Sequence, residues 1–207
     1  MANVWFCSDL HIGHKNIGKF RKEVKDDQDN RDYIKLWWDR LVTKRDLVWV
    51  LGDSAFTEEG IDWIADLKGE KRLIRGNHCD LPTTSYQRAF SEIYGLVKYK
   101  GMWLSHAPIH PDELRGKVNC HGHTHYYNIK EQIVGGAEDN YQIVSSFRDD
   151  KRYLNCCVEN FTRELGRPLA SLNEVRNYFK TGKLAIPNDT TGRLHINADN
   201  KTYEIKN

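Results

Sequence analysis

Short apolar runs alternate with amphipathic stretches along the first half of the chain. Residues 3–7 and 47–51 are mostly apolar, and each run ends at a polar turn that contains an aspartate. Apolar runs of this length, bounded by turn residues, are typical of buried strands. Residues 33–42 and 58–68 instead place apolar side chains at the spacing of one helical face, and a further strand is predicted over 71–75. The charge-rich residues 21–32 are expected to be a connection. This alternation predicts an α/β domain whose strands pair mainly in parallel.

The second half of the chain is richer in strand patterns. We expect strands that end within residues 103–106 and 118–123, strands at 141–145 and 153–158, and one short helix that begins near Ser171. Two short segments, 194–196 and 202–205, predict a β-hairpin that forms a C-terminal extension over about 183–207. Because no Gly-, Pro- or Ser-rich linker and no internal repeat divides the sequence, we expect a single domain over residues 1–207.

Composition narrows the class of protein. Of the 207 residues, 39% are hydrophobic, 11% aromatic and 29% charged, which is too polar for a membrane protein and too aromatic for a disordered one. No apolar run approaches the roughly 18 residues that a bilayer span needs. The N-terminus also lacks the layout of a signal peptide. We therefore expect a soluble protein without a membrane partner, in the cytoplasm of a bacterium or, if it is phage-encoded, of the host.

Charge and cysteine content exclude little but set two expectations. Lysine and arginine number 31 against 29 acidic residues, and the five cysteines show no CxxC spacing, so neither a disulfide framework nor a zinc knuckle is expected. A basic stretch has two interpretations, a solvated face or a surface that steers a phosphorylated or nucleic-acid substrate. It consists of Lys15, Lys19, Arg21, Lys22 and Lys25.

Residues able to bind a metal follow the predicted strands at the point where each strand ends. In α/β sheets these carboxyl ends of strands meet at one crevice. The residues are, in chain order, Asp9, His11, Asp53, Asn77, His78, His106, His121, His123 and His125. Carboxylate, amide and imidazole donors without a thiolate favour a divalent transition metal over a closed structural zinc site.

Each of these residues also has an ordinary structural explanation. Asp9 and Asp53 are common turn residues, and a single histidine such as His106 is usually just partly buried. The cluster of His121, His123 and His125 is harder to explain in this way, because alternate residues of an extended segment share one face. The whole set, in this order, favours a metal centre.

The same segments resemble the five motifs of the calcineurin-like metallophosphoesterases. They are Asp9-Leu10-His11, Gly52-Asp53, Gly76-Asn77-His78, His106 and Gly122-His123-Thr124-His125. The similarity covers at least residues 4–125, and residues 8–17, with the pattern DxHxGHxNI, further resemble a branch of small bacterial and phage members. The resemblance implies a four-layer α-β-β-α sandwich, in which two mixed β-sheets are flanked by helices.

The resemblance also implies two divalent metal ions, with manganese favoured and iron, nickel or zinc as alternatives. Asp9, His11, Asp53 and His125 would hold one ion, while Asp53, Asn77, His106 and His123 would hold the other, with Asp53 as the bridge. A metal-bound hydroxide would then attack the phosphorus atom. His78 would be the catalytic residue that stabilises developing charge or protonates the leaving oxygen.

Three further residues beside the motifs keep two interpretations each. His14 either binds the substrate phosphate or supports the metal ligands, and His121 is either a supporting residue or a surface residue. Cys79, which follows Asn77-His78 where the family often has an acidic residue, is favoured as a small core residue over a reactive thiol.

The implied activity is hydrolysis of a phosphodiester or phosphomonoester, possible substrates being nucleotides or nucleic acids. Nucleotide-type diesters are favoured because the chain shows no cap domain that would enclose a small sugar phosphate. No Asp-Arg-Gly follows Asp53, which argues against a protein phosphatase. Two alternatives are a non-catalytic scaffold that binds protein partners and a nuclease subunit that needs a partner. The oligomeric state is left open.

Overall fold

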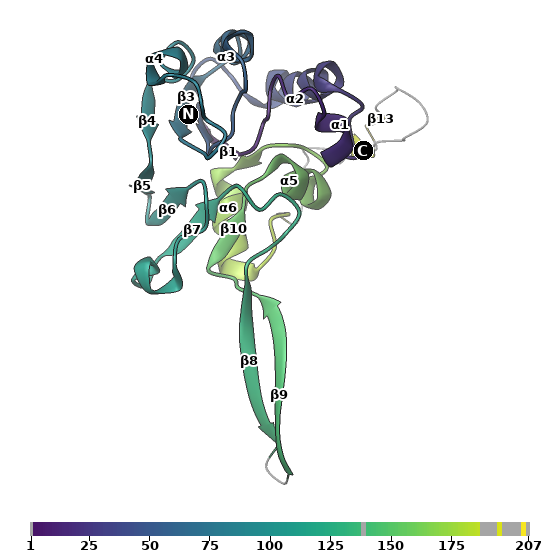
Figure 1. Ribbon diagram of the computed structural model, residues 1–207, viewed down its shortest axis with the longest axis vertical. Helices are drawn as coiled ribbons and strands as arrows, with labels where there is room; N and C mark the ends of the chain where they lie inside the picture. Colours follow the sequence, from purple (N-terminus) through teal and green to yellow (C-terminus); the bar gives the residue numbers. More distant parts are fainter. Residues whose placement is uncertain (1, 138–139, 187–193, 196–203, 206–207) are drawn as a thin grey trace.

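Two mixed β-sheets form the centre of the fold (Figure 1). The computed structural model describes residues 2–137, 140–186, 194–195 and 204–205. The first sheet has the strand order β11-β1-β2-β3-β4, in which β1 to β4 run parallel and β11 is antiparallel to β1. Its strands are β1 (Val4–Cys7), β2 (Leu47–Val50), β3 (Glu70–Ile74), β4 (Glu92–Tyr94) and β11 (Ala170–Ser171).

The second sheet has the order β10-β7-β6-β5. Strands β10, β7 and β6 are parallel, and β5 is the antiparallel edge. Its strands are β5 (Leu96–Tyr99), β6 (Met102–Ser105), β7 (Val118–His121) and β10 (Tyr153–Asn155). Each sheet thus combines parallel and antiparallel pairs, as the family resemblance implied.

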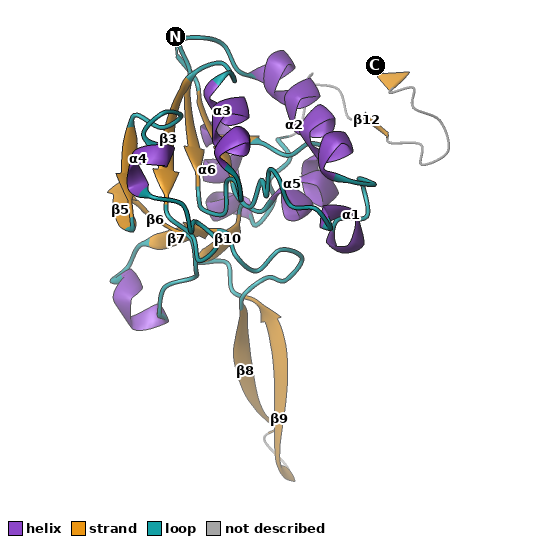
Figure 2. Cartoon of the chain, turned by 45° about the horizontal axis from the view of Figure 1, so that its top comes forward, coloured by secondary structure: helices purple, strands orange, loops and turns teal. Residues whose placement is uncertain are grey.

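Alternation along the central strands gives the first sheet two buried faces. In β2, Val48 and Val50 join one hydrophobic core, whereas Trp49 joins the other. Helices α2 (Asp27–Leu41) and α3 (Glu58–Ala65) contribute Ile34 and Ile61 to the first core. Both helices lie on one side of this sheet (Figure 2). The second core contains residues of both sheets, so the predicted sandwich of two mixed sheets flanked by helices is confirmed.

The remaining helices are α5 (Val158–Leu165), α6 (Leu172–Thr181) and three short segments, α1 (Ile17–Phe20), α4 (Thr83–Tyr86) and the 3-10 helix η1 (Pro111–Leu114). Phe161 of α5 and Val175 of α6 pack in the second core. The helix expected near Ser171 is α6, since Ser171 and Glu174 form a reciprocal capping box at its N-terminus.

The structure corrects two of the predicted boundaries. The charge-rich residues 21–32 were expected to be a connection, but α2 already begins at Asp27, because the side chain of Asp26 accepts a hydrogen bond from the Asp29 N–H and caps the helix. The strand predicted over 153–158 ends at Asn155, and helix α5 begins at Val158.

A long antiparallel hairpin projects from the body of the molecule (Figures 1 and 2). It consists of β8 (Lys130–Ala137) and β9 (Asn140–Asp149), of which only residues 141–145 were predicted as strand. At the C-terminal end, β12 (Leu194–His195) pairs antiparallel with β13 (Glu204–Ile205). The rest of the predicted terminal hairpin lies outside the described residues.

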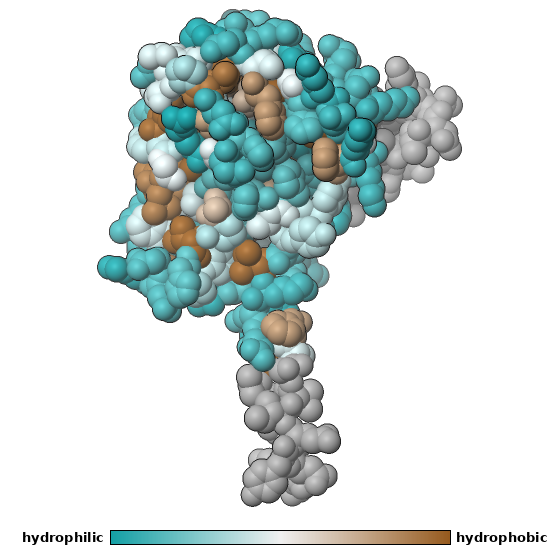
Figure 3. All heavy atoms as spheres, viewed as in Figure 1, coloured by the Kyte–Doolittle hydropathy of each residue, from teal (hydrophilic) through white to brown (hydrophobic). Residues whose placement is uncertain are grey.

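Most large apolar side chains of the described residues are buried in the two cores. On the face shown in Figure 3, the apolar side chains that remain visible form small, separate patches among hydrophilic ones. The longest described helix, α2, has 15 residues, and none of the helices in the described ranges combines the length and apolar character needed to cross a membrane.

Candidate metal centre

The candidate ligands lie in loops that follow the strands of both sheets. Asp9 and Asp53 come shortly after β1 and β2, and backbone hydrogen bonds join their two loops. The Asp9 N–H donates to the Gly52 carbonyl at 3.1 Å, and the His11 N–H donates to the Asp53 carbonyl at 3.0 Å. Because these two strands are adjacent and parallel, their loops meet at one edge of the sheet.

Two groups of donor atoms gather at this edge. Asp9, His11 and His125 form the first group, and Asp9, Asp53 and His106 form the second; within each group the donor atoms lie within 4.8 Å of one another. All these residues were expected to be ligands. The structure places Asp9 in both groups, whereas the family resemblance assigned the bridging role to Asp53.

The two carboxylate oxygens of Asp9 have different surroundings. Oδ2 lies 2.6 Å from the Ser8 hydroxyl, 3.0 Å from the His123 backbone N–H and 3.2 Å from the Cys157 thiol. Oδ1 is buried and has no hydrogen-bond partner among the described residues, and it lies 3.6 Å from Nε2 of His11 and 3.8 Å from Nε2 of His125. One oxygen is therefore held by protein donors, and the other is free to bind a cation.

His11 is 5% exposed, and neither of its ring nitrogens has a hydrogen-bond partner in the part of the chain that the structure describes. Its ring stacks on that of His125 at 5.2 Å and on Phe56 at 5.4 Å. Buried polar atoms are nearly always paired, so unpaired nitrogens beside an unpaired carboxylate oxygen need an explanation. A divalent metal between them satisfies both, and the donor set fits a transition metal.

In the second group, the hydrogen bonds of His106 settle which of its nitrogens can bind a metal. Nδ1 lies 2.8 Å from the Leu51 carbonyl, so this nitrogen carries the proton and donates it. Nε2 is then the nitrogen that faces the candidate site, and it lies 2.8 Å from Oδ1 of Asn77 and 3.3 Å from Oδ2 of Asp53. These contacts bring together three of the four residues implied for the second ion.

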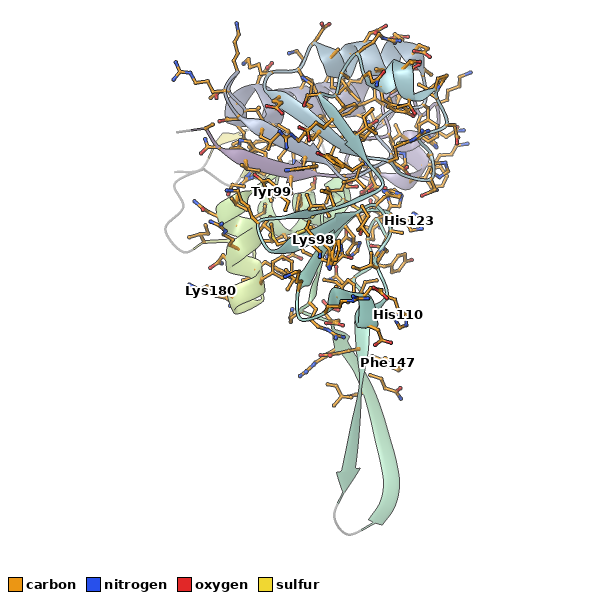
Figure 4. All side chains as sticks on the ribbon, turned by 90° about the vertical axis from the view of Figure 1, so that its left-hand side faces the viewer. Lys98, Tyr99, His110, His123, Phe147 and Lys180 are labelled. Atoms are coloured by element: carbon orange, nitrogen blue, oxygen red, sulfur yellow. The ribbon has the colours of Figure 1, made fainter. Side chains whose placement is uncertain are left out.

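His123, the fourth, lies at the margin of this group. Its exposed ring is centred 5.1 Å from that of His106, and Figure 4 shows it on the body of the molecule, above His110. The expectation that His121, His123 and His125 share one face is wrong. Strand β7 ends at His121, and the backbone of both later histidines is left-handed, with φ of 70° and 48°. His121 is fully buried, and burial lowers its pKa to about 4, so it is not a surface residue.

Backbone strain is concentrated in the ligand loops. Non-glycine residues rarely adopt a positive φ. Among the described residues, Lys100 and Arg115 are the only non-glycine cases outside the site. The other five are Asp9, His11, Asp53, His123 and His125. Strain of this kind persists where the surrounding structure imposes it, and it is common at functional sites.

Glycines in the motifs leave room for ligands from neighbouring loops. A Cβ atom on Gly52, whose φ is +106°, would overlap the ring of His106. A Cβ on Gly122 would overlap the Ser8 hydroxyl and press on the Asp9 carboxylate. The glycine before the aspartate and the glycine before the histidine are therefore packing requirements of the site.

A buried ion pair contacts two residues of the first donor group, His125 and Asp9, and the sequence pattern did not predict it. Glu159, at the start of α5, lies 3.2 Å from Nδ1 of His125 and 2.8 Å from Nη2 of Arg21. Arg21 also donates to the Asp9 carbonyl at 2.6 Å and to the Asn30 side chain. Arg21 had been counted with the basic surface stretch, but it is 1% exposed, so only the four lysines of that stretch are on the surface.

Neighbouring charges shift the pKa values of Asp9, Glu159 and His125. Burial raises the pKa of Asp9, but its interaction with the nearby ring of His11 and the charges of two further histidines outweigh burial and hold it well below its usual range. Burial likewise raises the pKa of Glu159, and the charge of Arg21 with the hydrogen bond of His125 lowers it to about 2. The hydrogen bond that His125 donates to Glu159 raises the pKa of His125. Both carboxylates are therefore ionised at neutral pH.

His14 and His78 line a cavity of about 440 Å³ beside the first donor group. The ring of His78 is centred 6.0 Å from that of His11, and its backbone N–H donates to Oδ1 of Asp53 at 2.9 Å. Nδ1 of His14 accepts a hydrogen bond from the Asn16 N–H at 3.2 Å, and burial lowers the pKa of His14. Cys79 points elsewhere, since it is buried in the first hydrophobic core.

A family model decides which protein family carries this geometry. The model of the calcineurin-like phosphoesterases matches residues 2–151, which include all the candidate ligands. This chain belongs to the calcineurin-like phosphoesterase family. Members bind divalent metals, and the unpaired donors of Asp9 and His11 fit that property.

Similar proteins include two from phages. The Gene 66 protein of Mycobacterium phage L5 is 34% identical over 163 residues, covering 60% of this chain and 78% of the phage protein. The Gene 66 protein of Mycobacterium phage D29 is 35% identical over 170 residues, covering 65% and 84% respectively. The crystal structure of a protein of unknown function from Aquifex aeolicus matches with a TM-score of 0.60 and 25% identity, covering 86% of this calcineurin-like chain and 99% of the other. The phage relatives agree with the small phage branch of the family.

Proposed function

We propose that this protein is a phosphoesterase that depends on two divalent metal ions, manganese being the favoured metal. The observation that carries the proposal is the buried Oδ1 atom of Asp9, which accepts no hydrogen bond from any described residue and lies within 4 Å of two histidine nitrogens. We assign Asp9, His11 and His125 to one ion and Asn77, His106 and His123 to the other. Asp53 is the proposed bridge.

Bound divalent ions would supply Lewis-acid chemistry and lower the pKa of a water molecule toward neutrality. The chain's own residues provide the geometry for this. Nδ1 of His106 is held by the Leu51 carbonyl and Nδ1 of His125 by Glu159, so both rings present Nε2 to the site.

His78 is the proposed catalytic residue. Its side chain is exposed at the cavity, and its backbone is tied to Asp53. An imidazole there can donate a proton to the leaving oxygen or stabilise charge that develops on the phosphoryl group. We assign phosphodiesters as favoured substrates over monoesters, and His14, on the same cavity wall, is the proposed contact to the substrate.

The test is hydrolysis by the purified protein after removal of metals and reconstitution with manganese, nickel, zinc or magnesium. Bis-p-nitrophenyl phosphate reports on diesters and p-nitrophenyl phosphate on monoesters. We expect turnover that requires metal, is faster on the diester, and is abolished by chelator. A protein that binds two metal ions but hydrolyses neither ester with any metal would instead be a scaffold of this family.

A further inference from the structure

Aromatic side chains form the wall of the cavity beside the metal centre. The cavity of about 440 Å³ is lined by Phe20, Phe56, Tyr126 and the four histidines His11, His14, His78 and His125, together with Ile17. Its volume falls within the range of small-molecule binding sites, which are mostly apolar with a few polar groups. We call it the aromatic cavity.

The rings of this cavity are in contact with one another in a continuous series. Phe56 stacks on His11, the ring of His14 meets Phe56 edge-on at 5.0 Å, and Phe20 meets His14 edge-on at 5.6 Å. The ring of Phe56 is also centred 5.5 Å from that of His78. The aromatic wall therefore begins at a proposed metal ligand and extends outward to the surface at Phe20.

Phe20 is an apolar residue held at the surface. It is 62% exposed, although it sits at the end of α1, whose backbone is fixed by hydrogen bonds from Ile17 to His14 and from Lys19 to Asn16. The Tyr126 hydroxyl donates to the Phe20 carbonyl at 3.2 Å and ties this segment to the loop that carries His125. An exposed aromatic ring on such a fixed support is available for a ligand.

We propose that the aromatic cavity binds the base of a nucleotide whose phosphate ester lies at the metal centre. This inference rests on the proposed function and adds the class of substrate. A planar base stacks on an aromatic ring whatever its sequence, which matches a wall of rings better than a simple sugar phosphate does. The four exposed lysines 15, 19, 22 and 25 surround Phe20 in the sequence and give this segment a positive charge that attracts a phosphorylated ligand.

Three of the tryptophans cannot provide such a platform. Trp37, Trp38 and Trp49 are each no more than 5% exposed and belong to the cores. Phe20 and Phe56, in contrast, border open space next to the reacting groups. The geometry thus selects these two phenylalanines as the residues that determine preference for a base.

The test compares two ligands that differ only in the base. Thymidine 5′-monophosphate and 2-deoxyribose 5-phosphate are titrated into the metal-loaded protein by calorimetry, which requires no turnover. We expect the nucleotide to bind about tenfold more tightly or better, since stacking on one ring contributes that much. Phe20→Ala is expected to remove most of this preference, and Phe20→Trp to retain it.

Phe147→Ala is the matched control. Phe147 is 65% exposed, like Phe20, but it lies on the long hairpin (Figure 4). The Phe147→Ala variant should bind thymidine 5′-monophosphate with the same preference over 2-deoxyribose 5-phosphate as the wild type. Equal affinities for the two ligands in the wild type, or a preference that survives Phe20→Ala, would overturn the inference. A clear preference in a protein without esterase activity would contradict the proposed function and leave the base site standing.

Discussion

Nδ1 of His125 lies 3.2 Å from Oε1 of Glu159, and the same oxygen accepts two hydrogen bonds from the guanidinium of Arg21. Glu159 is 1% exposed, so this carboxylate acts in a nearly dry environment. Its hydrogen bond keeps the proton of His125 on Nδ1 and turns Nε2 toward Asp9. The ion pair thereby connects helix α5 to a proposed metal ligand.

Glu159→Gln should weaken the binding of one of the two metal ions by about 10- to 100-fold, because the residue that orients His125 loses its charge. It should also lower the free energy of unfolding of the metal-free protein, since Arg21 is left buried without a counter-charge. Manganese titration by calorimetry and thermal unfolding measure the two effects.

Two further variants separate metal binding from folding. Glu164→Gln, on the exposed side of the same helix, should change neither quantity. Glu159→Asp keeps the negative charge near Arg21 but shortens the reach to His125, so it should lower metal affinity more than stability. Unchanged affinity for both ions in Glu159→Gln would show that Glu159 serves the fold alone.

His78→Ala should retain both metal ions and lose turnover by about 10²- to 10⁴-fold, the usual contribution of a general acid. The reason is that His78 lines the cavity but belongs to neither group of donor atoms. Metal content by mass spectrometry and hydrolysis of bis-p-nitrophenyl phosphate give the two readouts. His110→Ala, at an exposed histidine near η1, is the control. Loss of metal in step with activity would make His78 a structural support of the centre.

Asp53→Asn should reduce the bound metal to less than one ion per chain, whereas Asp9→Asn should leave one ion in place. This follows from the proposed bridging role of Asp53, whose Oδ2 lies 3.3 Å from Nε2 of His106. The two variants are compared because Asp9 belongs to both groups of donor atoms and is therefore the other candidate for the bridge. The opposite pattern of metal content would identify Asp9 as the bridge.

Much of this architecture could be predicted from local sequence pattern. Strands β1 and β2 are short apolar runs, whereas β3 is apolar only at its end, Leu73-Ile74. A polar turn follows each strand, and turns of this kind bring Asp9, Asp53 and Asn77 to one sheet edge. Periodicity also indicated α2 and α3. The start of α2 was missed because Asp26 is a helix cap, and charged residues at a helix start resemble a loop.

The rest depends on contacts between distant residues. Glu159 and Arg21 are 138 positions apart, and nothing local marks either as buried. The left-handed backbone at His123 and His125 turns their side chains away from the face of His121, which a strand pattern cannot indicate. Phe20 reads as an ordinary apolar residue in a basic stretch, and only the fold places it at the rim of a cavity.

Asp46 gives a prediction for stability outside the site. This buried carboxylate accepts hydrogen bonds from the Asn3 N–H at 2.6 Å and the Thr43 N–H at 2.9 Å. Burial raises the pKa of Asp46, but the hydrogen bonds from Thr43 and Asn3 outweigh burial and lower it. The unfolded value is about 3.9, so its contribution to stability is fully present above about pH 5 and is lost as the pH falls through the folded pKa.

Asp46→Asn should therefore lower the free energy of unfolding by about 1–3 kcal/mol at neutral pH, because a charged acceptor of buried N–H groups is removed. Urea unfolding followed by tryptophan fluorescence at a series of pH values checks this. The difference in free energy of unfolding between wild type and variant should become smaller below about pH 4, where the wild-type carboxylate also becomes protonated. Asp112→Asn, at an aspartate whose side chain is 89% exposed, should show little difference at any pH. A difference that stays constant down to acid pH would assign the effect of Asp46 to packing instead of charge.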